Sequence, residues 1–278
     1  MPFQVQGGGS GGGVMKVVWV TGASSGIGEA LVHRFVREGW GVVAFARRKE
    51  RLAALAAHYP QQVLPFVGDV RNMTDCEAAV QAAVERFGNL HAVIANAGIS
   101  MRALVEEARE EVLREVMEVN FWGAVRTIRA ALPLIKKNQG WIVGVSSIAG
   151  FRGLPARSAY SASKSALHGF LEALRVELRP AGVKVLIAAP GFTKSEIRQK
   201  ALTASGIPQA ESPLPEDQLM SAEAVAEAIY RAMKRHKKYL VLTTEGRLVR
   251  WLNCLAPGWL DKVLYERFAA EPGSPLAR

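Results

Sequence analysis

A tyrosine and a lysine, Tyr160 and Lys164, are the side chains with the clearest capacity for proton transfer. They are four positions apart within residues 158–178, where apolar residues recur at helical spacing, so both face one side of the expected helix. A phenol with an ordinary pKa of about 10 is a poor base at neutral pH, but a nearby ammonium favours the phenolate and lowers that pKa. The pair therefore predicts a general acid for a ketone, or a general base for an alcohol. Because such pairs are common on ordinary helices, this prediction depends on the residues that accompany it.

A serine that follows an apolar run supplies a third polar group. Ser147 lies just after the run 141–145, where a hydroxyl can hydrogen-bond a substrate oxygen as negative charge develops on it. Ser146 is adjacent, so the run by itself leaves both hydroxyls as candidates.

A glycine-rich segment, TGASSGIG at Thr21–Gly28, lies between the first apolar run and an amphipathic stretch, residues 29–37. Its glycines allow a tight turn and a close approach of the backbone to a pyrophosphate, whose charge is favoured at a helix N-terminus. The spacing G-x-x-x-G-x-G is one residue longer than the usual dinucleotide fingerprint, and a flexible turn is the alternative interpretation. In this strand–turn–helix context the segment predicts a dinucleotide site.

The end of the second apolar run predicts which dinucleotide binds. An acidic side chain there would accept hydrogen bonds from the adenosine ribose and repel a 2′-phosphate. The sequence instead has Ala46 followed by Arg47 and Arg48, and arginine offers planar, forked donors that suit phosphate. We therefore expect NADP(H), with Arg47 as the main contact and Arg48 as the second. Two surface arginines at a helix start are the alternative.

Short apolar runs and longer amphipathic stretches alternate along the chain. Such runs are typical of strands buried on both faces of a parallel sheet. The expected strands are Lys16–Val20, Gly41–Ala46, Val63–Val67, Ala92–Ala95, Trp141–Val145, Val183–Ala188 and Tyr239–Leu242. This alternation predicts an α/β fold with a doubly wound, mostly parallel seven-stranded sheet and helices on both faces. Ligands in such sheets bind beyond the carboxyl ends of the strands, where each of these motifs falls. Thr74 and Glu77 predict a capping box for a helix over residues 78–87.

Taken in order, the motifs resemble those of the short-chain dehydrogenase/reductase family, from Lys16 to about Met233. The matching segments are TGASSGIG at Thr21–Gly28, Asp69-Val70, ANAG at Ala95–Gly98, Asn120, Ser147, YSASK at Tyr160–Lys164, and Pro190-Gly191. The thirteen-residue interval to Tyr160 matches the family at Ser147 rather than Ser146. The resemblance implies a single-domain Rossmann oxidoreductase that needs no metal, transfers hydride between a nicotinamide and a carbonyl carbon, and forms a homodimer or homotetramer.

The resemblance also implies roles for individual residues. The implied catalytic residues are Asn120, Ser147, Tyr160 and Lys164. The implied cofactor-binding residues are Gly22, Ser24, Ser25, Gly26, Ile27, Gly28, Arg47, Arg48, Asp69, Val70, Asn96, Ala97, Gly98, Tyr160, Lys164, Pro190, Gly191 and Thr193. Asp69 and Val70 would border the adenine, although Asp69 could instead be an ordinary N-cap for the next turn. Some family members that bind the 2′-phosphate carry a base where this chain has Ser25, so the NADP(H) prediction depends on the second strand alone.

Composition and length are those of one large globular domain. The chain has 278 residues, of which 49% are apolar and 22% charged, which excludes disorder and collagen. No apolar run reaches the length of a membrane helix, and no secretory signal is evident, so we expect a cytoplasmic protein. Two cysteines and five scattered histidines provide no disulfide framework and no local metal motif.

Four segments are expected along the chain. Residues 1–14 are a flexible glycine-rich tail or an added linker, and residues 15–278 are the oxidoreductase domain. Within that domain, residues 192–220 form a substrate lid whose apolar content favours a hydrophobic or bulky carbonyl substrate. The apolar lid residues are Ile197, Leu202, Ile207, Leu214, Leu219 and Met220. A basic and apolar extension over about 231–270 packs over the pocket or against another subunit, or else contacts a membrane surface as an amphipathic element, which we favour less.

The net charge of +10 raises the question of other partners. Seven lysines and arginines lie between Arg231 and Arg250 against one acid, Glu245. No recognised nucleic-acid-binding motif accompanies this charge, so we expect no nucleic-acid partner. The sequence therefore predicts an NADP(H)-dependent reductase or dehydrogenase for a ketone or aldehyde and an alcohol. A catalytically weak NADP(H)-binding sensor is the alternative.

Overall fold

A seven-stranded parallel sheet in the order β3-β2-β1-β4-β5-β6-β7 forms the centre of the computed structural model, which describes residues 15–210 and 219–276. The strands are β1 Val17–Thr21, β2 Gly41–Ala46, β3 Val63–Val67, β4 Ala92–Ala95, β5 Trp141–Val145, β6 Lys184–Ala189 and β7 Tyr239–Val241. All six strand pairings are parallel. The predicted doubly wound sheet is thus confirmed.

Helices connect successive strands and cover both faces of the sheet. The α-helices are α1 Gly26–Arg37, α2 Lys49–His58, α3 Met73–Phe87, α4 Glu110–Met117, α5 Gly123–Lys137, α6 Ser158–Glu177, α7 Ala222–Lys234, α8 Thr244–Leu255 and α9 Pro257–Ala269. A π-helical turn, η1 Glu118–Trp122, joins α4 to α5, and short 3-10 turns, η2 Ile148–Gly150 and η3 Arg179–Ala181, flank α6.

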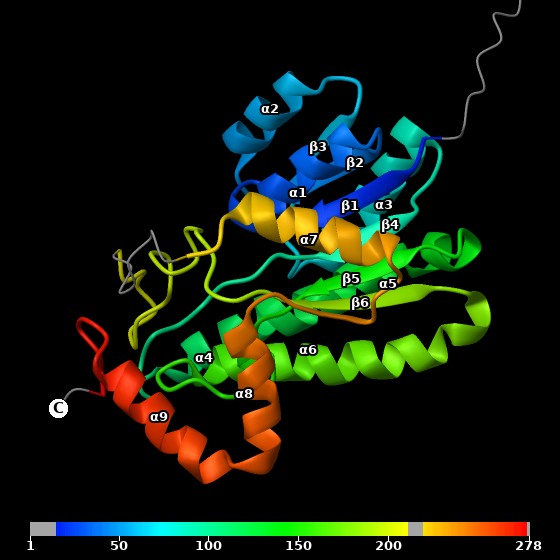
Figure 1. Ribbon diagram of the computed structural model, residues 1–278. Helices are drawn as coiled ribbons and strands as arrows, with labels where there is room; N and C mark the ends of the chain where they lie inside the picture. The colour runs from blue at the N-terminus through cyan, green and yellow to red at the C-terminus, as the bar shows by residue number, and fades with distance from the viewer. Residues whose placement is uncertain (1–14, 211–218, 277–278) are drawn as a thin grey trace, which may run out of the picture.

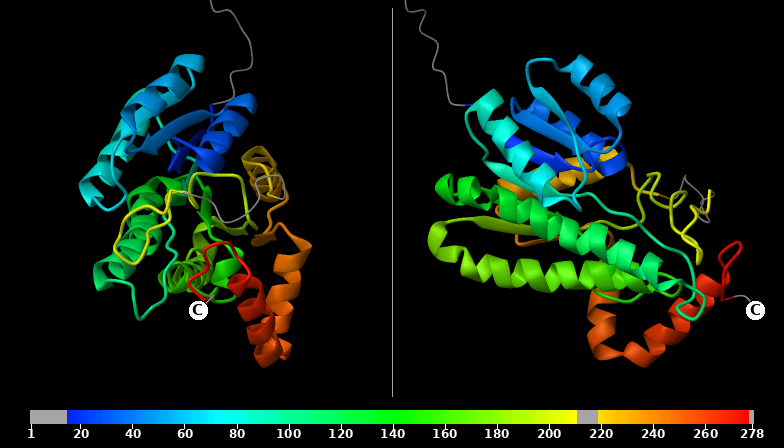
Figure 2. Two further views of the ribbon diagram at one scale, coloured as in Figure 1. Left: turned by 90° about the vertical axis from the view of Figure 1, so that its left-hand side faces the viewer. Right: turned by 180° about the vertical axis from the view of Figure 1, so that it is seen from behind.

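The alternation of side chains along β1 explains why both faces need a cover. Val18 and Val20 pack into the core that contains α1 and α7, whereas Val17 and Trp19 pack into the core that contains α3, α5 and α6. All four side chains are fully buried. Figure 1 shows α1 and α7 in front of the sheet, and the view from behind in Figure 2 shows α3 and α5 over the opposite face.

Element boundaries depart from the sequence predictions in a few places. The first and sixth strands begin one residue later than predicted, at Val17 and Lys184, and the seventh ends one residue earlier. The predicted capping box of α3 is wrong. The helix begins at Met73, and its N-cap is Asn72, whose side chain accepts a hydrogen bond from the Thr74 backbone N–H. Asn72 precedes Thr74 and caps at least as well, so the helix starts five residues earlier than predicted.

The C-terminal helices α8 and α9 project from the sheet as a hairpin at the bottom of Figure 1. They follow β7 and lie at the end of the molecule where the strand carboxyl ends meet. Within residues 15–210 and 219–276, no helix combines the length and the apolarity that crossing a bilayer requires. The predicted tail at residues 1–14 lies outside the described residues.

Candidate active site

A cavity of about 390 Å³ opens at the carboxyl ends of the strands. It extends from the glycine loop after β1 to the inner faces of α8 and α9, and it includes the residues that begin α6. Every residue that the sequence analysis assigned to catalysis or cofactor binding lines this cavity, except Gly28 and Asn120. Those two lie behind its wall, where each supports a residue or loop that does line it.

The glycine loop is shaped so that side chains cannot replace its glycines. Gly22 has a φ of 68°, and a Cβ there would lie 2.9 Å from the Cα of Ala97. A Cβ on Gly28 would lie 2.1 Å from the Gly22 carbonyl oxygen. The N-cap of α1, Ser25, makes no side-chain cap hydrogen bond, so the first N–H groups of the helix have no side-chain acceptor there. This bare helix start behind a tight loop fits a dinucleotide pyrophosphate.

The loop after β4 is fixed to the glycine loop through Thr21. The Thr21 hydroxyl accepts hydrogen bonds from the backbone N–H groups of Asn96 and Ala97 at 3.0 and 3.1 Å. In return, the Asn96 side-chain amide donates to the Thr21 carbonyl oxygen at 2.9 Å. Asn96 therefore braces the two neighbouring strand ends.

Of the two predicted phosphate-binding arginines, Arg48 makes the closer contacts with the loop. Its Nε donates to the Ser24 hydroxyl at 3.0 Å, and its Nη2 donates to the Ser25 hydroxyl at 2.5 Å. Arg47 lies at the exposed rim of the cavity, with Nη1 4.0 Å from a carboxylate oxygen of Asp69. The geometry thus brings the second-ranked arginine, rather than the first, against the glycine loop.

Asp69 lines the cavity and also shapes its own turn. One carboxylate oxygen accepts from the Arg71 backbone N–H at 2.9 Å, and the other accepts from the Arg71 guanidinium at 2.7 Å. Asp69 therefore caps the turn that follows it, as the alternative interpretation expected, whereas the N-cap of α3 is Asn72. Val70 lies beside α5, where a Cβ on Gly123 would come within 2.6 Å of its side chain.

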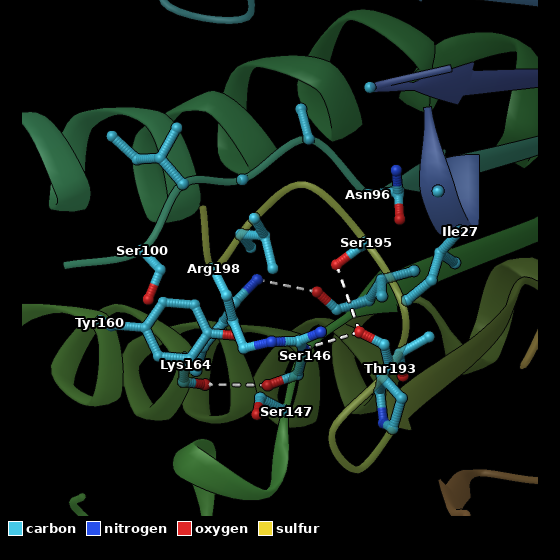
Figure 3. Close-up of a pocket in the computed structure, with 18 of the residues that line it drawn as sticks. Ile27, Asn96, Ser100, Ser146, Ser147, Tyr160, Lys164, Thr193, Ser195 and Arg198 are labelled. Atoms are coloured by element: carbon cyan, nitrogen blue, oxygen red, sulfur yellow. Dashed lines mark hydrogen bonds between the residues drawn. The ribbon is translucent and has the colours of Figure 1, made fainter. Parts of the chain in front are cut away.

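Three polar side chains meet where β5 ends and α6 begins (Figure 3). Ser147 lies close enough to the Tyr160 phenol to favour its ionised form. The Lys164 ammonium lies 5.7 Å from the centre of the Tyr160 ring and donates to the Val145 carbonyl oxygen at 3.0 Å. The Ser146 hydroxyl, by contrast, donates to the backbone, to the Lys164 carbonyl oxygen at 3.4 Å. The choice of Ser147 over Ser146 therefore agrees with the geometry.

Burial changes the pKa values of both Tyr160 and Lys164. Burial raises the pKa of the Tyr160 phenol, while the Ser147 hydrogen bond and the charge of Arg157 act in the opposite direction. Burial also lowers the pKa of the Lys164 ammonium to about 8. In the protein by itself, desolvation of the phenolate therefore outweighs the attraction of nearby positive charge, and the predicted lowering of the phenol pKa needs more positive charge than the protein supplies here.

Asn120 occupies the centre of the π-helical turn η1 and is 1% exposed. Its amide donates to the Ile99 carbonyl oxygen at 2.9 Å and to the Ser163 hydroxyl at 3.0 Å, and its oxygen accepts from the Ile99 N–H at 2.8 Å. The side chain thus joins the loop after β4 to α6. A Cβ on Gly98 would lie 3.1 Å from its oxygen and 3.5 Å from the Lys164 nitrogen, so this loop must come close to both.

The start of the lid crosses the cavity opposite Tyr160. The Thr193 hydroxyl donates to the Gly191 carbonyl oxygen at 3.0 Å, and the Thr193 carbonyl oxygen accepts from Arg198 at 2.7 Å. Figure 3 shows the Arg198 side chain running between Tyr160 and Thr193. Arg198 was not predicted, because nothing in its sequence neighbourhood distinguishes it from a surface arginine.

The apolar lining differs from the six apolar lid residues that we expected. Of the five that the structure describes, Ile197 lines the cavity, whereas Leu202 packs beside Met101 and Ile207 is exposed. Leu214 lies outside the described residues. The apolar lining residues at this end are Leu154, Phe192, Val249, Leu264 and Phe268. The inner face of the C-terminal extension lines the cavity through Val249, Leu264 and Phe268. Its outer face exposes Leu248, Trp251, Leu255, Trp259 and Tyr265.

A buried ion cluster fixes the C-terminal segment to the cavity wall. Glu271 accepts from Arg157 at 3.0 Å and from Arg102 at 3.3 Å, and all three side chains are at most 11% exposed. Arg157 also lies over the ring of Phe268, 4.8 Å from its centre. This cluster was not predicted, because more than a hundred residues separate Arg157 from Glu271.

Comparison with known proteins agrees with this architecture. Residues 16–205 match the family model described as short chain dehydrogenase. The chain is 33% identical to 11-beta-hydroxysteroid dehydrogenase A of Sesamum indicum over 270 residues, covering 94% of this chain and 77% of that protein. A short-chain dehydrogenase from Streptomyces avermitilis superposes with a TM-score of 0.76 at 31% identity, covering 91% of this chain and 95% of that one. A short chain dehydrogenase from Burkholderia cenocepacia in complex with NADP gives 0.76 at 26% identity, covering 90% and 97%.

Proposed function

The chain belongs to the short-chain dehydrogenase/reductase family of oxidoreductases, and on this premise we propose that it is an NADP(H)-dependent enzyme that interconverts a ketone or aldehyde and an alcohol. We further propose that its carbonyl substrate is hydrophobic or bulky. The observation that carries the proposal is the meeting of Tyr160, Ser147 and Lys164 in the same cavity as the glycine loop.

In this proposal each polar side chain has a distinct task. When bound, the cofactor supplies or accepts the hydride. Tyr160 donates a proton to the carbonyl oxygen during reduction and removes it from the alcohol during oxidation. Ser147 holds the same oxygen by a hydrogen bond as charge develops on it. Lys164 favours the phenolate electrostatically and orients the cofactor ribose, and Asn120 keeps α6 and the loop after β4 in position.

The cofactor preference is supported by the charge beside the glycine loop. Ala46 stands at the end of β2, where an acid would favour NAD(H); Arg47 and Arg48 follow directly, and Arg51 lies in the first turn of α2. The forked donors of Arg48 already face the loop hydroxyls, and the Burkholderia relative is in complex with NADP. The Kd for NADPH should therefore be lower than the Kd for NADH, and Arg48→Ala should reduce this difference. Equal or tighter binding of NADH would contradict the cofactor assignment.

The substrate class is supported by the wall opposite the glycine loop. Leu154, Phe192, Val249, Leu264 and Phe268 offer apolar contacts beside the reacting side chains. The name of the sesame relative refers to a hydroxysteroid, which is a bulky apolar alcohol of this kind. We therefore expect steroid-like or long acyl ketones to be preferred over sugars.

A substrate screen with a matched pair of variants tests the proposal. The purified full chain is supplied with NADPH and with steroid, acyl-chain, sugar and small aromatic ketones, and NADPH oxidation is followed. Tyr160→Phe should bind NADPH as the unmodified chain does but lose turnover by a factor of about 10² or more. Tyr59→Phe removes a hydroxyl that contacts His33 outside the cavity, and it should leave turnover unchanged. NADPH binding without turnover of any ketone would favour the sensor alternative, and full activity of Tyr160→Phe would refute the assignment.

We propose a homodimer or homotetramer built on the helices that contain Asn120 and Tyr160. Trp122 in η1 and Val176 in α6 expose large apolar side chains on this part of the surface, which supports a packing role. Light scattering on the purified full chain in solution should give the mass of two or four subunits. A monomer at micromolar concentration would contradict this proposal.

A further inference from the structure

The first part of the lid is fixed to the adenosine end of the cavity by one carboxylate. Glu196 accepts hydrogen bonds from Arg48 at 2.6 Å, from Arg51 at 2.7 Å and from Lys200 at 2.6 Å. The neighbouring residue Ser195 lies directly over the glycine loop, since a Cβ on Gly26 would come within 3.1 Å of the Ser195 Cβ. The lid therefore reaches the arginines across the loop that holds the pyrophosphate in the proposed function.

The partners of Glu196 form an anion site. Arg48 and Arg51 come from the segment between β2 and the first turn of α2, and Lys200 comes from the lid itself. Two guanidinium groups and an ammonium surround the carboxylate and hold the pKa of Glu196 at about 2, with the Lys200 hydrogen bond as the largest favourable cause. Glu196 thus remains ionised throughout the neutral range and neutralises the charges that would otherwise face an incoming anion.

A 2′-phosphate and the Glu196 carboxylate would compete for the same donors. The phosphate carries about −1.5 to −2 charges and three acceptor oxygens, against one charge and two oxygens on the carboxylate. Arg48 already directs its other donors to Ser24 and Ser25 on the cavity side. A carboxylate within reach of the phosphate would also repel it, so both anions cannot share Arg48 and Arg51 at full strength.

We propose that Glu196 is a specificity-determining residue that occupies the 2′-phosphate site of the cofactor with an internal carboxylate, so that binding of a 2′-phosphate releases the lid. This inference rests on the proposed NADP(H) function and extends it. A ligand without the 2′-phosphate leaves the ion cluster of Glu196, Arg48, Arg51 and Lys200 intact. A ligand with it takes over the arginines and frees Glu196 together with the backbone that follows.

Binding of two small probes separates the 2′-phosphate from the rest of the cofactor. The dissociation constants of 2′,5′-ADP and 5′-AMP are measured by calorimetry for the full chain and for Glu196→Gln. Glutamine keeps the size of the side chain and removes its charge. We expect 2′,5′-ADP to bind about tenfold more tightly to the variant, as expected for the loss of competition from partly exposed ion pairs. The affinity for 5′-AMP should change less than about twofold.

Glu227 provides a matched control. Its carboxylate also bridges two arginines, Arg34 and Arg231, and is 35% exposed against 31% for Glu196, but it lies on α7 and does not line the cavity. Glu227→Gln should change neither dissociation constant. A change of the same size in this variant would show that the effect of Glu196→Gln is a general effect of net charge, and would overturn the proposal.

Hydrogen exchange on the unmodified chain tests the release of the lid without any substitution. The Lys200 N–H donates to the Glu196 carbonyl oxygen, and the Leu202 N–H donates to the Ser100 carbonyl oxygen. Saturating 2′,5′-ADP should accelerate exchange over residues 196–202, whereas saturating 5′-AMP should not. Equal exchange with the two ligands would overturn the coupling.

The outcomes also distinguish this inference from the function on which it rests. If both probes bind and Glu196→Gln affects them equally or not at all, the role of Glu196 is refuted while the nucleotide site stands. If 2′,5′-ADP binds no better than 5′-AMP even to the variant, the NADP(H) assignment fails and the inference fails with it.

Discussion

Replacing Lys164 with methionine should make the protein more stable at neutral pH while removing its activity. The Lys164 side chain is 4% exposed, and burial lowers the pKa of its ammonium from 10.5 to about 8. At pH 7 the amine is therefore protonated in both the folded and the unfolded chain, and the folded protein bears the desolvation of a buried charge. Methionine has a similar length and no charge.

The size of the effect follows from two opposing contributions. The fall in pKa corresponds to about 3 kcal/mol, since one pKa unit equals about 1.4 kcal/mol. Against this, the variant loses the hydrogen bond from Nζ to the Val145 carbonyl oxygen, which contributes about 1 to 2 kcal/mol. We therefore expect Lys164→Met to raise the free energy of unfolding by about 1 to 2 kcal/mol at pH 7.

The sign of the pH dependence provides the sharper test. Between pH 8 and 10.5 the unfolded chain binds a proton at Lys164 that the folded chain has released, so the unmodified protein gains stability as the pH rises. Methionine does not titrate, so its advantage should shrink over this range and reverse once both states are neutral.

Urea unfolding at pH 7, 8.5 and 10, followed by tryptophan fluorescence, measures this difference directly. Lys184→Met is the control, because Lys184 also donates to a backbone carbonyl, that of Gln139, but from an exposed position. A lower stability of Lys164→Met at pH 7, or a difference that stays constant with pH, would refute the reasoning. A stabilised but inactive variant would agree with a lysine retained for chemistry rather than for the fold.

Three other substitutions test neighbouring parts of the structure. Burial holds the pKa of His168 at about 4. As the pH falls below 6.5, the unfolded chain therefore takes up a proton that the folded chain does not, and the free energy of unfolding should drop by about 2 kcal/mol between pH 7 and 5. In urea titrations, His168→Leu should remove this drop. Gly144→Ala places a Cβ 2.3 Å from Leu171 and should lower the free energy of unfolding by about 1 to 3 kcal/mol, and an unchanged urea midpoint would contradict this packing. Glu271→Gln should lower the free energy of unfolding by about 3 kcal/mol, because Arg157 loses its neutralising partner. The unpaired charge of Arg157 should also lower the pKa of Tyr160, so the limb on which alcohol oxidation rises with pH should move to lower pH; an unshifted pH profile would contradict this link.

The sequence was sufficient for the sheet and for the placement of its motifs, because both depend on local patterns. Strands buried on both faces appear as apolar runs, and β2, β3, β4 and β5 have the bounds predicted from those runs. Motifs that directly follow such runs must lie at the carboxyl edge of the sheet. For this reason Gly22, Asn96 and Ser147 could be assigned to one cavity before their distances were known.

The charged contacts that cover the cavity could not be predicted in the same way. Arg48 and Glu196 are separated by 148 residues, and Arg157 and Glu271 by 114. Long charged side chains at such separations give no periodic signal, and each of these residues is individually typical of a surface. The prediction that the apolar lid residues face the substrate was too broad for a related reason. Composition does not show which way a loop side chain points, and Ile207 faces solvent.

These charged contacts share one arrangement, which bears on how the site works. Arg48 at the adenosine end is neutralised by Glu196 from the lid, and Arg157 beside the phenol is neutralised by Glu271 from the C-terminal segment. Each carboxylate therefore ties a covering segment to the cavity and reduces the positive charge that the cavity presents. Burial disfavours the Tyr160 phenolate in the protein by itself, so ionisation of the phenol must depend on added positive charge. A bound ligand can bring that charge. Movement of either segment can also supply it, because Arg48 or Arg157 then loses the carboxylate that neutralises it.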